Sequence, residues 1–360
     1  MRWRLDDEQE AYSESLKGWM GAAAPTDLVR KWVEEDGTDE FERRLVDEGF
    51  AGVGIAEELG GQGGSTVELT LTGELLGQHA APSTSWLTAA LALPALAAHA
   101  DLAELVSAGE PIALAVRADR PVDAARSVHV DAGGRLSGDV PHVLGASRAT
   151  RILVPVDTPD GVEVRLVDTS DAPGLERSAT PLLDPTRSAA TVKFDQTPST
   201  RLDVDATTFL TESATLAALL AAADSLGAQQ RMLDMAVEYS SERHQFGQPI
   251  GAFQAVKHAA ATILVGIEAS RSIVYYAAAS VAAGHELRGM HVAAAKTQVT
   301  AAGVAAADSA LTLHGAIGYT WEHDLHLFYK RARFDAVLGG SNKVWNERIA
   351  IGLNLSGLLV

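Results

Sequence analysis

Two segments in the last third of the chain combine cationic, amide and glycine residues in a pattern that suits an anionic ligand. The first reads RHQFGQPIGAFQ and runs from Arg243 to Gln254. Apolar helical periodicity precedes and follows it, so we expect Arg243 at the junction of two helices. A guanidinium there offers a fork of hydrogen bonds to a diphosphate, with Gln254 within reach of the same ligand. In the alternative interpretation, Arg243 pairs with Glu238 or another nearby acid and only ends its helix.

The second segment, LTLHGAIGY, occupies residues 311–319 and is followed by an acidic and then a basic run. Its glycines would let a ligand approach the backbone closely. We interpret His314 as a hydrogen-bonded turn residue rather than a catalyst. His323 and His326 could suggest a metal site, but a solvated polar patch at a helix start fits them better, so we expect no metal.

Composition narrows the range of functions. The chain has 360 residues, of which 29 are Lys or Arg and 47 are Asp or Glu, for a formal net charge of −18. Nucleic-acid binding is therefore not expected, because it depends on clustered cations. The absence of cysteine excludes disulfides, thiolate metal sites and cysteine nucleophiles. No apolar stretch of membrane-spanning length is evident and the N-terminus is charged, so we expect a cytoplasmic protein without membrane contact.

Three compositional regions follow one another along the chain. Residues 1–110 show helical patterns. Residues 111–205 contain short valine-rich segments separated by Gly, Pro and Asp, and the alternation of Val162, Val164 and Leu166 with charged residues indicates a strand. Residues 206–360 are rich in Ala and Leu at three- and four-residue spacing, which predicts long packed helices.

Together the two motifs resemble the acyl-CoA dehydrogenase family. RHQFGQPIGAFQ is similar to its R-x-x-F-G-x-x-I-x-x-F-Q stretch, and HGAIGY to its H-G-G-x-G-Y stretch, with Ala316 in place of the second glycine. EELGGQGG, near Glu57, is similar to a loop of its N-terminal domain. The resemblance implies an α+β fold with a helical domain over 1–110, a small β-barrel-like domain over 111–205 and a four-helix-bundle domain over 206–360.

The same resemblance implies FAD as cofactor and an acyl-CoA thioester as substrate. In the family, a carboxylate removes the α proton while the β carbon gives hydride to the flavin. Carried over by residue, Arg243 would contact the FAD diphosphate, and Phe246 and Gln254 would line its adenosine side. Gly315 would lie where backbone approaches FAD across a subunit interface.

The catalytic base, however, has no counterpart at either position that the family uses. Gly339 stands where the family's usual Glu would be, and Ala217 lies in the region of the alternative position, so we assign no catalytic residue. The carboxylates nearest in the sequence are Glu347, Asp335 and Glu212. The flavin-facing stretch 138–145 and the acyl-binding turn 117–121 also depart from the family pattern.

The leading hypothesis is a non-catalytic subunit of a heteromeric acyl-CoA dehydrogenase. This pattern resembles the base-lacking chain of two-plus-two tetramers associated with steroid side-chain CoA thioesters. A second dehydrogenase-like chain would then carry the catalytic Glu, and FAD sites would be fewer than chains. Two alternatives stay open: a self-sufficient flavoenzyme with a relocated base, and an assembly scaffold that has lost flavin.

Overall fold

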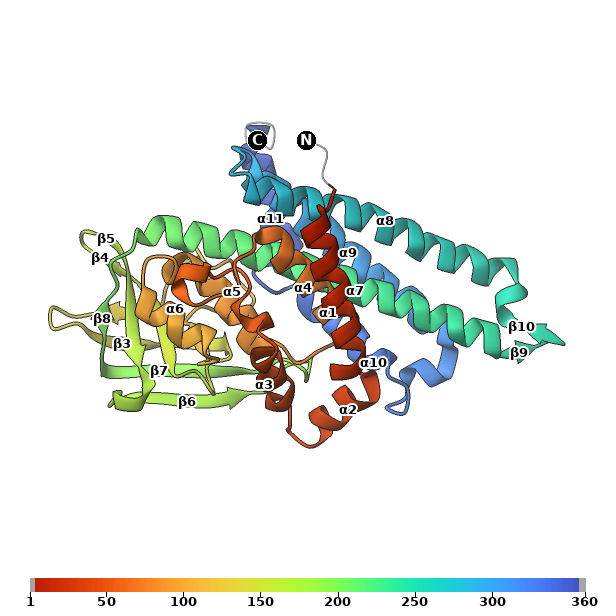
Figure 1. The fold of residues 1–360 in the computed structure, drawn as a ribbon, viewed down its shortest axis with the longest axis horizontal. Coiled ribbons are helices and arrows are strands. Elements are labelled where there is room, and N and C mark those ends of the chain that lie inside the picture. Colours follow the sequence, from red (N-terminus) through yellow and green to blue (C-terminus); the bar gives the residue numbers. More distant parts are fainter. Residues whose placement is uncertain (1–3, 356–360) are drawn as a thin grey trace.

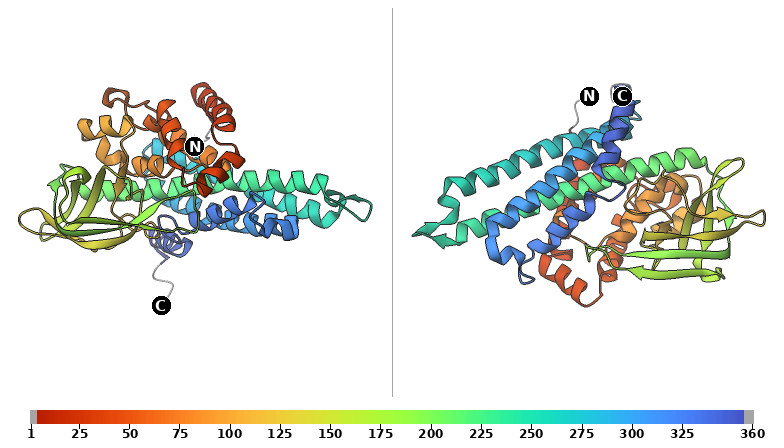
Figure 2. Two further views of the ribbon diagram at one scale, coloured as in Figure 1. Left: turned by 90° about the horizontal axis from the view of Figure 1, so that it is seen from below. Right: turned by 180° about the vertical axis from the view of Figure 1, so that it is seen from behind.

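The computed structural model describes residues 4–355. Helices form the N- and C-terminal regions and two sheets lie between them in the sequence, which confirms the expected α+β architecture (Figure 1). The sheets occupy one end of the molecule, and the long C-terminal helices extend away from them (Figure 2). The N-terminal helices are α1 (Asp7–Ala23), α2 (Thr26–Glu34), α3 (Asp39–Asp47), α4 (Thr66–Gln78), α5 (Thr84–Leu96) and α6 (Ala100–Ser107).

Local hydrogen bonds explain where the N-terminal helices begin. Asp6 caps α1: its carboxylate accepts from the Gln9 amide at 2.9 Å, and the Gln9 side chain accepts from the Asp6 amide at 3.2 Å. Ser65 and Glu68 form the same reciprocal cap at α4.

The middle region consists of two four-stranded sheets, with strand orders β1-β4-β5-β8 and β2-β3-β7-β6. All neighbouring strands are antiparallel except β1 and β4. Side chains of both sheets bury a common apolar cluster around Leu136, Ile152 and Phe194. The strands are β1 (Ile112–Leu114), β2 (His129–Val130), β3 (Arg135–Leu144), β4 (Arg151–Thr158), β5 (Gly161–Asp168), β6 (Leu175–Thr180), β7 (Ala189–Pro198) and β8 (Thr200–Arg201).

The C-terminal region is built on α7 (Ala206–Glu242), which runs from beside the sheets to the opposite end of the molecule (Figures 1 and 2). By length and apolar composition alone, α7 could span a membrane. However, 72% of its most apolar 18-residue segment is buried inside the protein, as in the core helix of a folded domain. The other elements are the hairpin β9 (His244–Gln245) and β10 (Gln248–Pro249), and the helices α8 (Gln254–Ala282), α9 (Arg288–His314), α10 (Leu325–Asp335) and α11 (Asn342–Gly352). The domain boundaries at 110/111 and 205/206 stay predictions.

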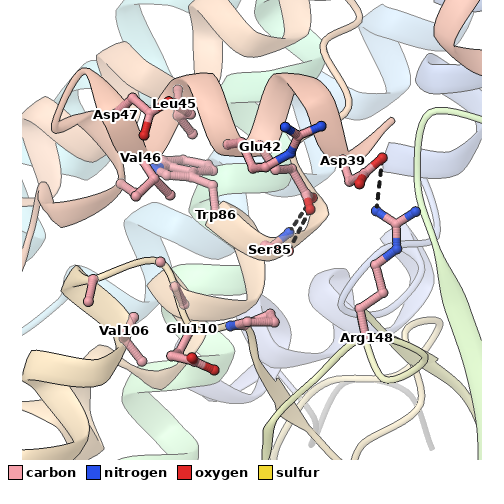
Figure 3. Close-up of a pocket in the computed structure, with 16 residues that line it drawn as sticks. Asp39, Glu42, Leu45, Val46, Asp47, Ser85, Trp86, Val106, Glu110 and Arg148 are labelled. Atoms are coloured by element: carbon pink, nitrogen blue, oxygen red, sulfur yellow. Dashed lines mark hydrogen bonds and ion pairs between the residues drawn. The ribbon is translucent and has the colours of Figure 1, made fainter. Parts of the chain in front are cut away.

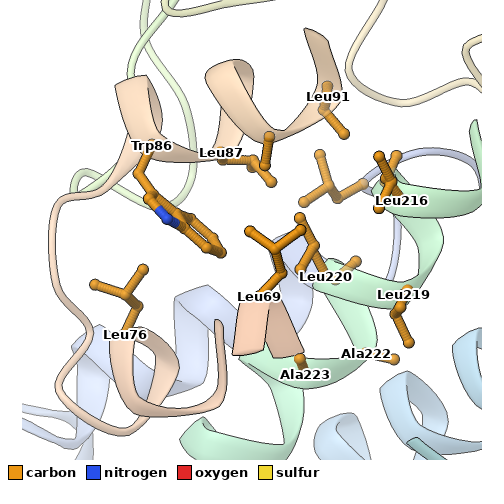
Figure 4. Packing of buried hydrophobic residues seen from close by; sticks show 14 of the residues in the cluster. Leu69, Leu76, Trp86, Leu87, Leu91, Leu216, Leu219, Leu220, Ala222 and Ala223 are labelled. Atoms are coloured by element: carbon orange, nitrogen blue, oxygen red, sulfur yellow. The ribbon is translucent and has the colours of Figure 1, made fainter. Parts of the chain in front are cut away.

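The main core lies where α4 and α5 pack on α7 (Figure 4). Leucines such as Leu69, Leu87 and Leu220 fill it. Glycines bring the α4 and α7 backbones together: a Cβ on Gly227 would lie 1.8 Å from the Glu74 main-chain oxygen. Because this close packing holds α7 against α4 and α5, the positions along α7 are fixed relative to the rest of the molecule.

Candidate functional site

The two positions at which the family resemblance predicts a catalytic base lie side by side. Gly339 follows α10 and Ala217 lies on α7. A Cβ built on Gly339 would lie 3.2 Å from the Ala217 Cβ. Gly339 has a positive φ of 65°, a conformation that costs little only for glycine. Tertiary structure thus places both positions at one point, and neither carries a carboxylate.

The segment that follows β1 packs directly against Gly339 and Gly340. The Gly339 amide donates to the Ala118 main-chain oxygen at 2.7 Å, and the Trp345 indole donates to the Gly339 oxygen at 3.0 Å. A Cβ on Gly340 would lie 2.9 Å from Pro121. The cavity left beside Gly339 measures about 20 Å³, which is room for one water molecule. A thioester does not fit there.

Residues of the stretches 117–121 and 138–145 line what remains of this space. The cavity walls include Arg117 and Arg120 from the turn and Leu144 from the end of β3. The pairing of β3 with β7 is interrupted between Val140 and Val143, and His142 in that interval has a φ of 56°. The stretch 138–145 therefore does not form a regular strand surface beside Gly339.

The three other carboxylates considered as bases lie elsewhere. Glu347 is exposed on α11, and Glu212 is exposed on α7, where it lines a separate open cavity of about 720 Å³. Asp335 is fully buried at the end of α10. None of these three residues is among the described residues that line the cavity beside Gly339.

The opposite end of α7 carries the arginine motif. Arg243 is exposed and caps the helix through its amide, which donates to the Tyr239 oxygen at 2.9 Å. The β9–β10 hairpin follows, and Phe246 and Gly247 form its turn with φ of 52° and 81°. Two positive φ values fit the twist of a two-residue hairpin. This geometry leaves the Phe246 side chain 92% exposed.

The other predicted nucleotide contacts lie on the same end of the molecule. Gln254 is exposed as the first residue of α8. Gly315 follows α9 with a φ of 63°, and a Cβ there would meet open space. The rings of Tyr239 and His314 stack at 5.0 Å, which joins the Arg243 end of α7 to the Gly315 turn.

Within residues 4–355, the Arg243 side chain forms no hydrogen bond or ion pair. The pairing with Glu238 that the sequence left open is not formed. Arg243 therefore presents a free guanidinium at the same end of the molecule as the open backbone of Gly315, and a free guanidinium suits the diphosphate of a dinucleotide.

The two halves of the expected site are far apart within one chain. Ala217 and Arg243 are 26 residues apart along α7, which corresponds to about 39 Å at 1.5 Å per residue. That is longer than a flavin dinucleotide. The Arg243 end and the Gly339 region of one chain therefore cannot serve the same cofactor.

A buried ionic cluster was not anticipated from the sequence. Arg331 on α10 contacts Asp184 at 2.6 Å and Asp224 on α7 at 2.9 Å, and Arg187 contacts Asp224 at 2.9 Å. Burial raises the pKa of Asp224, but the two guanidinium groups outweigh it and hold that pKa below its usual value. The cluster joins three segments that are far apart in the sequence, around residues 184–187, 224 and 331, so no local signal could have revealed it.

Lys296 and Asp335 lie beside this cluster and are also fully buried. The Lys296 ammonium donates to the main-chain oxygen of Asp335. Burial lowers the pKa of Lys296 to about 7. Burial and the neighbouring Asp224 raise the pKa of Asp335 well above its usual range. Asp335 has no exposed surface through which a substrate could reach it, which further excludes it as a base.

A larger cavity of about 340 Å³ lies between α3, α5 and α6 (Figure 3). The Glu42 carboxylate accepts from the amide and hydroxyl of Ser85 at 2.8 and 2.7 Å there, and Arg148 approaches Asp39 at 3.7 Å. None of the predicted site residues lines it. It is therefore separate from both halves of the candidate site.

Comparison with known families gives two matches along the chain. Residues 6–103 match "Acyl-CoA dehydrogenase, N-terminal domain", and residues 208–353 match "Acyl-CoA dehydrogenase, C-terminal domain". The second match includes the arginine motif, the Gly315 turn and Gly339.

Similar proteins include mycobacterial acyl-CoA dehydrogenases. The chain is 30% identical to acyl-CoA dehydrogenase IpdE2 of Mycobacterium tuberculosis, over 92% of this chain and 93% of that protein. It is 31% identical to IpdE2 of Mycolicibacterium smegmatis, over 93% of this chain and 96% of that protein.

Solved structures with the same fold include heteromeric complexes. A variant of the Tcur3481-Tcur3483 steroid ACAD matches with a TM-score of 0.85 and 26% identity, over 98% of this chain and 99% of that chain. The ChsE4-ChsE5 complex from Mycobacterium tuberculosis matches with a TM-score of 0.87 and 24% identity, with the same coverage.

Proposed function

Because the chain belongs to the acyl-CoA dehydrogenase family, we propose that it is the base-lacking subunit of a heteromeric FAD-dependent acyl-CoA dehydrogenase. In this role it completes the FAD site of a partner chain that carries the catalytic Glu. The reaction of the complex is the α,β-dehydrogenation of an acyl-CoA thioester.

The filled space at Gly339 is the observation that carries this proposal. Ala118 packs against Gly339 through a main-chain hydrogen bond, and a cavity of only about 20 Å³ remains beside it. Neither Gly339 nor Ala217 can accept a proton. A chain built in this way contributes nothing to proton removal at its own position.

The Arg243 end supports a role toward a neighbouring chain. The Arg243 guanidinium would hold the FAD diphosphate, Phe246 and Gln254 would line the adenosine side, and the open backbone of Gly315 would allow close approach. FAD bound there supplies the hydride-accepting chemistry of the reaction. A separation of about 39 Å along α7 supports assigning this end to a partner's cofactor rather than to the chain's own site.

The similar proteins support a heteromeric and steroid-related assignment. One solved relative is described as the Tcur3481-Tcur3483 steroid ACAD and another as the ChsE4-ChsE5 complex. We therefore propose a steroid side-chain CoA thioester as substrate of the complex, and a cytoplasmic location. Acyl selectivity then belongs to the catalytic chain, because this chain leaves no acyl pocket at Gly339.

Coexpression with a candidate partner tests the proposal. We expect the copurified complex to contain fewer FAD molecules than chains, and this chain alone to show no dehydrogenase activity. Arg243→Ala should weaken the affinity of the complex for FAD by about 10- to 100-fold, because it removes a hydrogen bond to a charged group. Arg243→Lys should recover part of it, because the charge remains without the fork.

Lys17→Ala is the matched control, because it removes an exposed cation from α1 and should leave flavin content unchanged. A lone preparation that desaturates acyl-CoA with one FAD per chain would establish the self-sufficient alternative instead. Unchanged flavin content in an intact Arg243→Ala complex would favour the flavin-free scaffold for this chain.

A further inference from the structure

The cavity between α3, α5 and α6 lies where the N-terminal helices meet the sheet region (Figure 3). It measures about 340 Å³, which is within the range of small-molecule sites. Besides the three helices, its walls include residues 108–111, which lead from α6 to β1, and Arg148, which lies between β3 and β4. Segments that are distant in the sequence therefore converge on one hollow.

Apolar side chains form a large part of the cavity walls. Val46 on α3, Trp86 on α5 and Val106 on α6 surround the cavity in Figure 3, and Pro111 also lines it. An apolar ligand body that packs against these side chains is removed from water, which favours binding.

Glu42 on α3 supplies a carboxylate in a fixed position. One of its oxygens accepts from the Ser85 amide at 2.8 Å, and the other accepts from the Ser85 hydroxyl at 2.7 Å. Ser85 is the second residue of α5, and a negatively charged side chain is stabilised at a helix N-terminus. Each carboxylate oxygen has room for a further hydrogen bond. Glu42 is therefore held in place while it keeps the capacity to accept from a ligand.

The Glu42 carboxylate lacks a cationic partner within the chain. Among residues 4–355 it forms no ion pair, although the residue is half-buried. Arg43 follows it in the helix, and consecutive helical residues do not face each other. Arg148 approaches Asp39 instead, at 3.7 Å. Because charges withdrawn from water are normally paired, a half-buried, unpaired carboxylate in a cavity wall favours a cation from outside the chain.

The other charged residues of the cavity walls also favour a cation. Asp47 and Glu110 are exposed, and among the described residues neither side chain has a hydrogen-bond or ion-pair partner. Four carboxylates and two guanidinium groups line the cavity, which leaves a formal charge of −2. This excess attracts a cationic ligand and repels an anionic one.

We propose that this cavity binds a small organic cation, a primary ammonium group on an apolar body. The ammonium donates to the Glu42 carboxylate, and the body packs against Val46 and Trp86. The site goes beyond the proposed dehydrogenase function and does not depend on it, because no residue assigned to the FAD contacts or to the base position lines the cavity.

Isothermal titration at pH 7 of the purified protein, alone or in complex with its partner, tests the proposal with three probes. We expect 2-phenylethylammonium to bind. The probes 2-phenylethanol and 3-phenylpropanoate share its aromatic body but lack the cation. They should bind at least about tenfold more weakly, since they cannot donate a charge-assisted hydrogen bond to Glu42.

Two charge variants and one shape variant locate the binding. Glu42→Gln keeps the shape of the side chain but removes its charge, and should weaken 2-phenylethylammonium binding by about tenfold or more. Glu110→Gln changes an exposed residue and should weaken binding by about two- to fivefold. Ala108→Trp keeps every charge but places a bulky ring at an exposed position of the wall, and should abolish binding.

Glu104→Gln is the matched control, because it removes an exposed carboxylate of α6 that does not line the cavity. It should bind 2-phenylethylammonium as the parent does.

The proposal is overturned if 2-phenylethylammonium does not bind, or if either uncharged or anionic probe binds as tightly. It is also overturned if Ala108→Trp and Glu110→Gln both leave binding unchanged, a result that does not depend on how well Glu42→Gln folds. These outcomes concern the cavity alone, so they are independent of FAD content and of dehydrogenase activity.

Discussion

Restoring a carboxylate at the vestigial base position is a direct test of the idea that this site is closed. Gly339→Glu adds five side-chain atoms at a point where a Cβ alone would lie 3.2 Å from Ala217. The adjoining cavity of about 20 Å³ cannot receive them. The substitution should therefore destabilise the chain without creating activity.

The expected cost follows from two features of Gly339. Its φ of 65° costs a non-glycine residue roughly 1–2 kcal/mol. Overpacking against Ala217 and Ala118 adds about 1–3 kcal/mol. A total of about 2–5 kcal/mol corresponds to a fall of about 3–7 °C in the thermal midpoint, given an unfolding entropy of about 2.1 cal/mol/K per residue.

The assay compares unfolding midpoints and dye-linked dehydrogenase turnover per flavin for the parent, Gly339→Ala and Gly339→Glu. Gly339→Ala should show the backbone cost with little of the overpacking. Asn346→Glu adds the same side chain at an exposed position of α11 and should leave both quantities near the parent values. A Gly339→Glu protein that keeps its midpoint, or that gains turnover or bound FAD, would refute the closed-site argument.

Two further predictions concern the buried charges. Arg331→Met leaves Asp184 and Asp224 without the cation that they share. It should lower the free energy of unfolding, measured by urea titration, by about 3–5 kcal/mol. A loss below about 1 kcal/mol would contradict an essential role for this cluster. The pKa of Lys296 is about 7 in the folded chain and about 10.4 in the unfolded chain. As pH falls from 10 toward 7, the unfolded chain therefore takes up a proton at this lysine and the folded chain does not. The free energy of unfolding should consequently decrease from pH 10 toward pH 7. Lys296→Met should flatten that slope, and parallel pH profiles for the two proteins would show that Lys296 stays charged when folded.

The sequence predicted the helical and sheet regions well because their signals are local. The Asp6 cap, the valine-rich strands and the periodic leucines of α7 depend on residues a few positions apart. The Arg243 segment was placed at a helix junction for the same reason. Its turn lies at Phe246 and Gly247, whose two positive φ values fit a two-residue hairpin.

The resemblance to a family identified which residues stand at the expected catalytic positions, but it could not show how the surrounding segments pack against them. That Gly339 replaces a glutamate is readable from the sequence. That Ala118 packs against Gly339, and Pro121 against Gly340, depends on packing between segments more than two hundred residues apart.

The amino-acid sequence by itself determined the order of elements, the negative net charge and the loss of a proton acceptor. Each of these depends on residue identity or on neighbours along the chain. The buried cluster around Arg331 and the closure of the base position were decided only by tertiary structure. Burial and desolvation act through space, so side chains acquire altered ionisation and free or satisfied hydrogen bonds only when distant segments pack together.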